Sequence, residues 1–269
     1  MINLKTIEEI NIMREGGKIL AEILQKLAES VKPGITTNDL EKLARELVLY
    51  YKVKPSFLGY DGYPAVLCTS VNDEIVHGLP SERVLKDGDL LKIDMGVLRK
   101  GFHTDSAMTV LVGQNDEVIH RPTEFPKSGR CPTPRTFNVG HQQKLISVTK
   151  EALKIGISKA RVGNTLGDIG SAIQKYVEDN GFNVVRDLVG HGIGRELHEP
   201  PQVMNYGEAG EGEELKEGMV IAIEPMVVTG GWKIKNGKDG FGFITKDGGL
   251  AAHFEHTVVI TENGPLILT

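Results

Sequence analysis

The chain repeats part of its own sequence about halfway along, and this repeat constrains the fold more than any other feature. Residues 84–97, VLKDGDLLKIDMGV, match residues 214–227, ELKEGMVIAIEPMV, at an offset of 130. Residues 32–40, KPGITTNDL, match residues 161–169, RVGNTLGDI, at an offset of 129. A solenoid would need at least three short repeats. Two long repeats instead predict two pseudo-symmetric α+β halves that pack as one unit. The matched pairs include Leu85 with Leu215, Gly88 with Gly218, Ile93 with Ile223, and Asp94 with Glu224.

Helices are expected before strands in each half. Thr6 and Glu9 form a capping-box pattern ahead of apolar residues at helical spacing, which ends at Lys32–Gly34. A second helix is indicated after Thr36. Residues 90–112 are typical of a β-hairpin with Lys100 and Gly101 near its turn.

The chain is predicted to form a single domain over residues 1–269, with halves at about 1–113 and 141–269. Between them, residues 115–140 contain four prolines, mixed charge and no periodicity, which predicts an irregular surface insertion. A composition of 40% apolar and 25% charged residues is that of an ordinary globular protein with one sizeable core.

Charge and hydropathy exclude several classes of partner. A net charge of −5 provides no basic face for sequence-specific nucleic-acid binding. The first twenty residues are too charged for a signal peptide, and no apolar run reaches membrane-spanning length, so a cytoplasmic protein is expected. Cys68 and Cys131 are expected to be thiols rather than a disulfide.

Four acidic residues lie in strand-like apolar runs, where an uncompensated charge costs several kcal/mol. They are Asp94, Asp105, Glu224 and Glu255. No Lys or Arg lies beside Asp105, Glu224 or Glu255 in the sequence, whereas His191 lies in the glycine-rich stretch VGHGIGRELHEPP. Four carboxylates and one imidazole suit a pair of divalent ions, which would lower the pKa of a bridging water. The sequence therefore predicts a dinuclear metal site.

Five motifs, taken in order, resemble those of the methionine aminopeptidases, type 1 (bacterial-like), which have the pita-bread fold. They are VNDEIVHGLP, KIDMGVLRKGFHTDSA, GHGIGRELHE, IAIEPM and AHFEHT. The resemblance implies an α+β fold with two pseudo-symmetric halves and an antiparallel β-sheet core covered by helices. It also implies that Asp94, Asp105, His191, Glu224 and Glu255 bind metal, and that His77 and His198 contact substrate.

The same resemblance implies how the site works. Glu224 would act as general base and then acid for a bridging water, and His198 would hydrogen-bond the developing oxyanion. Two ions of Co, Mn, Fe or Zn would serve as cofactors. The methionine pocket would comprise Phe57, Tyr60, Tyr63, Cys68, Leu197 and Phe241. Leu197, Phe241 and His253 replace the Phe, Trp and Gln that are frequent in the family.

The activity expected from this resemblance is removal of N-terminal methionine from nascent proteins and peptides with a small second residue. The enzyme is expected to be a monomer that associates transiently with the ribosome. One alternative is an Xaa-Pro peptidase of the same fold, which shares the five ligands but usually carries an additional N-terminal domain. The other alternative is a non-catalytic binding module, as in members of the fold that have lost ligands.

Overall fold

The computed structural model describes residues 2–113 and 139–269 of the chain. The predicted insertion lies outside the described residues except for Val139 and Gly140, which begin a helix. Four α-helices and one short 3-10 helix occur in the described part. These are α1 (Ile7–Ser30), α2 (Thr37–Tyr51), η1 (Tyr60–Gly62), α3 (Val139–Lys159) and α4 (Leu166–Asp179).

The strands form three sheets, and every pairing among the described strands is antiparallel. The largest sheet has the order β1-β4-β5-β14-β9-β7-β8, with β2 also pairing β4 and β15 pairing β14. The smaller sheets are β13-β10-β6 and β11-β12-β3. The strand bounds are β1 (Lys54–Pro55), β2 (Cys68–Val71), β3 (Glu74–Val76), β4 (Leu90–Arg99), β5 (Phe102–Leu111), β6 (Asn183–Val184), β7 (Gly190–Gly192), β8 (Glu199–Val203), β9 (Val220–Ile223), β10 (Met226–Val228), β11 (Ile234–Asn236), β12 (Phe243–Thr245), β13 (Ala251–His253), β14 (Glu255–Thr261) and β15 (Gly264–Ile267).

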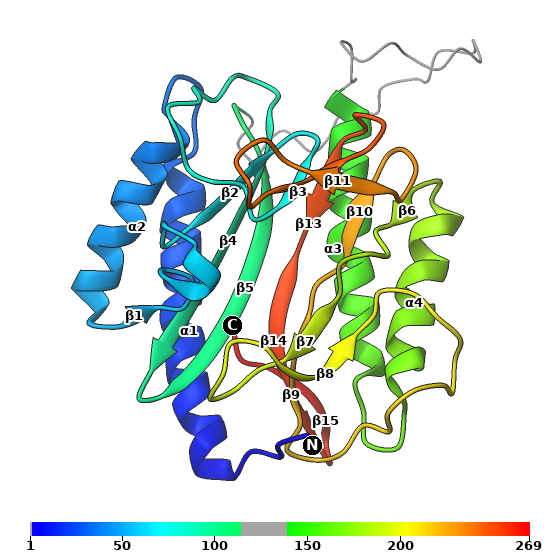
Figure 1. Ribbon diagram of the computed structural model, residues 1–269. Helices are drawn as coiled ribbons and strands as arrows, with labels where there is room; N and C mark the ends of the chain where they lie inside the picture. The colour runs from blue at the N-terminus through cyan, green and yellow to red at the C-terminus, as the bar shows by residue number, and fades with distance from the viewer. Residues whose placement is uncertain (1, 114–138) are drawn as a thin grey trace.

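The helices lie in two pairs that flank the strands. Figure 1 shows α1 and α2 (blue) on one side and α3 and α4 (green) on the other. Helix α1 packs against β4 and β5, whereas α3 packs against β13 and β10. Each pair covers its own cluster of buried apolar residues, one containing Leu20, Leu40 and Ile93 and the other Leu153, Ile173 and Ile223. This arrangement confirms the predicted α+β fold.

The two halves repeat the same backbone contacts. The Gly34 amide donates to the Leu85 carbonyl at 2.9 Å, and the Gly163 amide donates to the Leu215 carbonyl at 3.1 Å. Both glycines have positive φ, 93° and 85°, a conformation that favours glycine. Thr36 with Asp39 and Thr165 with Asp168 then form capping boxes at the start of α2 and α4. The sequence repeat is therefore also a repeat of structure.

The local predictions for the first half agree with the described elements. Thr6 caps α1 through a capping box with Glu9, and the helix ends at Ser30. Strands β4 and β5 pair along their whole length, from Leu90 opposite Leu111 to Arg99 opposite Phe102. Lys100 and Gly101 make the turn with φ of 48° and 85°, the left-handed conformations that tight hairpins require. Among the described residues, none of the helices combines the length and hydropathy needed to cross a bilayer.

Candidate metal centre and substrate pocket

Strand register brings the four predicted acidic ligands to one face of the large sheet. Ala107 of β5 lies opposite Asp94 of β4 on one side and opposite Glu255 of β14 on the other. Opposed residues of antiparallel strands share a face, and so do residues two apart on one strand. Asp105 therefore projects from the same face, beside the small Ala107 side chain.

Glu224 joins this group from the end of β9. Its neighbour Ile223 lies opposite His256, the residue after Glu255. Alternation along the strands therefore places Glu224 on the face of Glu255. Two of these acids come from the first half of the chain and two from the second, as the sequence repeat predicts for Asp94 and Glu224.

Three of the four carboxylates are buried, and none of the four pairs with a lysine or arginine in the described part of the chain. Asp94, Asp105 and Glu255 are 7%, 4% and 2% exposed. No Lys or Arg in residues 2–113 and 139–269 makes an ion pair with any of the four acids. Asp94 Oδ1 and Glu255 Oε1 are buried without a hydrogen-bond partner. Orphaned carboxylate oxygens of this kind fit a site for divalent cations.

Burial and mutual repulsion both favour the protonated form of these acids. Burial raises the pKa of Asp105 to about 7. Burial, followed by the charge of Asp105, raises the pKa of Glu224 and of Glu255 well above the usual range. Burial also raises the pKa of Asp94, again with a contribution from Asp105. A bound cation would reverse this balance, because it stabilises the ionised carboxylates.

His191 presents one ring nitrogen to the acids. Its Nδ1 lies 2.9 Å from the Gly192 carbonyl oxygen, so Nδ1 carries the proton and donates it to that carbonyl. The lone pair then lies on Nε2, which is 3.7 Å from Glu224 Oε1. Burial, together with the nearby His198, lowers the pKa of His191 to about 3, so the ring is neutral at pH 7. Ligand atoms of Asp105, His191 and Glu255 all lie within 4.8 Å of one another.

The acids line a cavity of about 180 Å³. This volume is below the roughly 300–1,000 Å³ typical of drug-sized ligand sites, so the cavity suits a single side chain. All thirteen residues predicted for the site line it, together with Asp61, which was not predicted. They are Phe57, Tyr60, Tyr63, Cys68, His77, Asp94, Asp105, His191, Leu197, His198, Glu224, Phe241 and Glu255.

Part of the lining of the cavity is apolar. Phe57, Tyr63 and Leu197 are at most 9% exposed, and the rings of Tyr63 and Phe241 meet edge to face at 5.4 Å. Cys68 is a free, buried thiol, and burial raises its pKa, so it contributes an uncharged surface. The structure thus combines an apolar wall with a cluster of acids in one small cavity.

The two remaining predicted histidines, His77 and His198, both line the cavity. His77 has φ of 60°, which is uncommon for a non-glycine residue, and burial lowers its pKa to about 4. His198 lies with its ring 4.4 Å from that of His191, centroid to centroid. Its Nδ1 is 2.8 Å from the Tyr60 hydroxyl, a contact between residues 138 positions apart.

Two neighbours of the site were not identified as such from the sequence. Asp61 lies in η1 with φ of 45°. Burial lowers the pKa of His198, and the charge of Asp61 acts in the opposite direction. His253 is 1% exposed, with Nε2 3.4 Å from Glu224 Oε2. Two features of the sequence pointed to His253, its place two residues before Glu255 and its replacement of the Gln that is frequent in the family.

Comparisons with known proteins place the chain in a family. The sequence model of metallopeptidase family M24 matches residues 11–262. A methionine aminopeptidase of Clostridium perfringens is 48% identical over 269 residues, covering 100% of this chain and 99% of the relative. The crystal structure of a methionine aminopeptidase from Thermotoga maritima superposes with a TM-score of 0.89 at 43% identity, covering 100% of this chain and 99% of that one.

The chain also matches longer relatives, but it covers a smaller share of their length. The prolidase from Pyrococcus furiosus superposes with a TM-score of 0.72 at 25% identity, and the match covers 99% of this chain but 65% of the prolidase. The methionine aminopeptidases instead match from end to end. The chain therefore belongs to metallopeptidase family M24 and, within it, to the methionine aminopeptidases.

Proposed function

We propose that the protein removes the N-terminal methionine from peptides and nascent proteins whose second residue is small. The observation that carries this proposal is the small cavity that apolar side chains line together with the five proposed metal ligands. An unbranched thioether suits such a lining, because methionine adapts to irregular apolar space. The free α-amine would lie toward the acids, so the cavity would admit a chain terminus and release one residue at a time.

The proposed cofactor is a pair of divalent ions held by Asp94, Asp105, His191, Glu224 and Glu255. Such ions, whether Co, Mn, Fe or Zn, would supply Lewis-acid polarisation and acidify water near neutral pH. The buried, partnerless oxygens of Asp94 and Glu255 support this assignment. We further propose that the enzyme acts as a cytoplasmic monomer with transient ribosome contact.

Glu224 is proposed as the group that moves protons. Burial, followed by the charge of Asp105, raises the pKa of Glu224. The Glu224 carboxylate can therefore hold a proton when no cation balances the charge of Asp105. Its two oxygens face different imidazoles, His191 and His253. Glu224 would accept a proton from the attacking water and donate it to the leaving amine.

His198 and His77 are proposed to contact the substrate. If the Tyr60 hydroxyl donates to His198 Nδ1, the proton of that ring lies on Nε2, where it can be donated to the scissile carbonyl as it becomes an oxyanion. Burial lowers the pKa of both histidines, so both are neutral donors at pH 7.

Replacing His198 with alanine is expected to lower kcat by roughly 10²–10³-fold, the loss typical of one oxyanion donor, about 2.7–4 kcal/mol. Tyr60→Phe, which keeps the ring but removes the hydroxyl beside Nδ1, is expected to give a smaller loss. Steady-state kinetics on Met-Ala-Ser measure both variants. A near-wild-type kcat for His198→Ala would reject its role.

The activity is tested by kcat/KM for a set of peptides with each candidate metal. Met-Ala-Ser is expected to be the best substrate, acetyl-Met-Ala-Ser to be inert, and Met-Leu-Ser to be poor. Leu-Ala-Ser is expected to react slowly, because small apolar differences separate substrates by only about 1–3 kcal/mol. Faster cleavage of Ala-Pro-Ala than of Met-Ala-Ser would instead support an Xaa-Pro peptidase.

A further inference from the structure

The segment that carries His77 is tied closely to β2. The Thr69 amide donates to the Gly78 carbonyl at 2.8 Å, and the Gly78 amide donates to Ser70 Oγ at 3.0 Å. A Cβ at Gly78 would lie 2.5 Å from the Thr69 carbonyl oxygen, so no other residue fits there without movement of the backbone. These contacts fix Gly78 against β2. The amide of the next residue, Leu79, donates to a different part of the chain.

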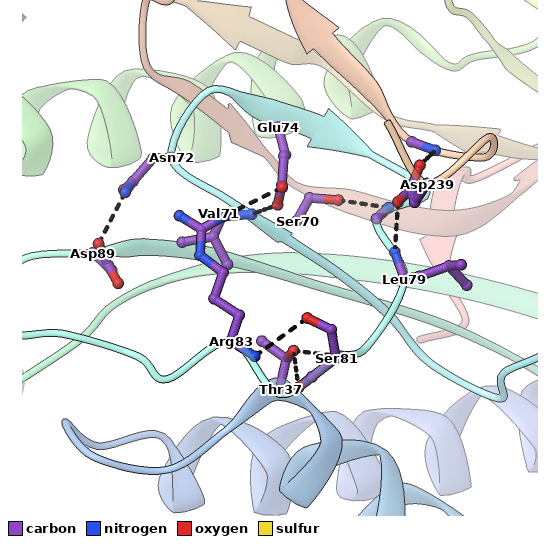
Figure 2. Close-up of polar contacts among 12 residues, drawn as sticks. Thr37, Ser70, Val71, Asn72, Glu74, Leu79, Ser81, Arg83, Asp89 and Asp239 are labelled. Atoms are coloured by element: carbon purple, nitrogen blue, oxygen red, sulfur yellow. Dashed lines mark hydrogen bonds and ion pairs between the residues drawn. The ribbon is translucent and has the colours of Figure 1, made fainter. Parts of the chain in front are cut away.

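That acceptor is Asp239, which lies 160 residues away in the loop between β11 and β12. Asp239 Oδ2 accepts from the Leu79 amide at 3.1 Å, as Figure 2 shows. Its other oxygen, Oδ1, accepts from the amides of Phe241 and Gly242 at 3.0 and 2.8 Å. One carboxylate thus joins the His77 segment of the first half to the Phe241 loop of the second.

Both joined segments contribute to the cavity. His77 and Phe241 line it, and the Phe241 ring packs against Tyr63, whose hydroxyl donates to the Gly78 carbonyl at 3.1 Å. Strand β12 also contacts the His77 segment. Phe243 pairs with Val76, and the centroid of the Phe243 ring lies 5.8 Å from that of the His77 ring. Burial opposes ionisation of Asp239, but the three amides outweigh it and lower its pKa, so the carboxylate is charged at pH 7.

We propose that Asp239 is a positioning residue, which holds His77 and Phe241 in register across the two halves and so sets both turnover and the choice of first side chain. The proposal rests on the proposed function for its kinetic readout. Asp239 itself does not line the cavity, so it acts through the two segments that it joins.

The Asp239→Asn variant tests this connection selectively. An amide has one oxygen, so it can accept from the Leu79 amide or from the Phe241 and Gly242 amides but presents an NH₂ group to the other side. We expect kcat/KM for Met-Ala-Ser to fall by roughly ten- to a hundredfold, because a misplacement of about 1 Å can cost about 10²-fold. The preference for Met-Ala-Ser over Leu-Ala-Ser is expected to fall as well.

Asp247→Asn is the matched control. Asp247 follows β12 at the other end of the same strand pair and accepts from the amides of Gly231 and Gly249 at 2.7 and 3.0 Å, but it has no contact with the His77 segment. We expect this variant to change thermal stability as much as Asp239→Asn does, while leaving kcat/KM and the methionine preference within twofold of wild type.

Hydrogen exchange at the Leu79 amide provides a readout that does not depend on activity. Exchange there is expected to accelerate in Asp239→Asn and not in Asp247→Asn. Unchanged protection of Leu79, or equal kinetic losses in both variants, would overturn the proposal. A wild-type protein that fails to cleave Met-Ala-Ser would refute the proposed function instead, and Leu79 exchange would still decide whether Asp239 joins the two segments.

Discussion

Replacing Glu224 with alanine is expected to lower kcat for Met-Ala-Ser by several orders of magnitude, since positioned acid–base catalysis alone contributes roughly 10²–10⁴-fold. The variant also loses a proposed metal ligand, so the two effects combine. Glu224 lies between His191 and His253, with oxygens 3.7 and 3.4 Å from their Nε2 atoms.

The measurement is single-turnover and steady-state kinetics at saturating metal. Glu224→Gln keeps the shape of the side chain but removes its charge, and it is expected to be nearly as impaired as alanine. Glu262→Ala, which changes an exposed residue in the turn between β14 and β15, is the control and should keep full activity. A Glu224→Ala enzyme with wild-type kcat would show that another group moves the proton.

Removing divalent metal is expected to abolish turnover and to lower the melting temperature. Without a cation, four carboxylates share one face of the sheet, and burial with mutual repulsion disfavours their ionised forms. A ligand that binds only the folded state stabilises it, by about 2.7 kcal/mol at a hundredfold excess over Kd. Readdition of Co, Mn, Fe or Zn should restore both properties.

Thermal melts and peptide hydrolysis before and after chelation check this expectation. Asp105→Asn removes one of the four acidic groups. We therefore expect the rise in melting temperature on metal addition to be smaller for this variant than for the wild type. Full activity in excess chelator, with no change in melting temperature, would contradict the assignment.

Much of the fold followed from local patterns. The capping box at Thr6, the start of the helix after Thr36 and the hairpin turn at Lys100 depend on neighbouring residues alone, so the sequence was sufficient to locate them. The sequence repeat predicts the same local structure in the second half, where Gly163 and Thr165 match Gly34 and Thr36. The two-residue strands β1 and β6 escaped prediction, because their pairing partners are distant in sequence.

The candidate site divides in the same way. All residues carried over from the family meet in one cavity, because the motifs place the acids and His191 on or directly beside β4, β5, β7, β9 and β14 of the large sheet. Contacts between motifs could not be predicted, since neither the Tyr60–His198 pair nor the Asp239–Leu79 contact leaves a periodic signal in the sequence. His253 was likewise missed, because its proximity to Glu224 depends on how β10 and β13 pair.

The most direct test of the account is calorimetric titration of the metal-free protein with Co²⁺ or Mn²⁺, followed by elemental analysis. We expect two bound ions per chain, with weakened uptake when Asp94 or Glu255, which have partnerless buried oxygens, is replaced by alanine. We also expect activity with Met-Ala-Ser to rise as the ions bind. A metal-free protein that takes up no ions and yet cleaves Met-Ala-Ser at the full rate in chelator would contradict this account.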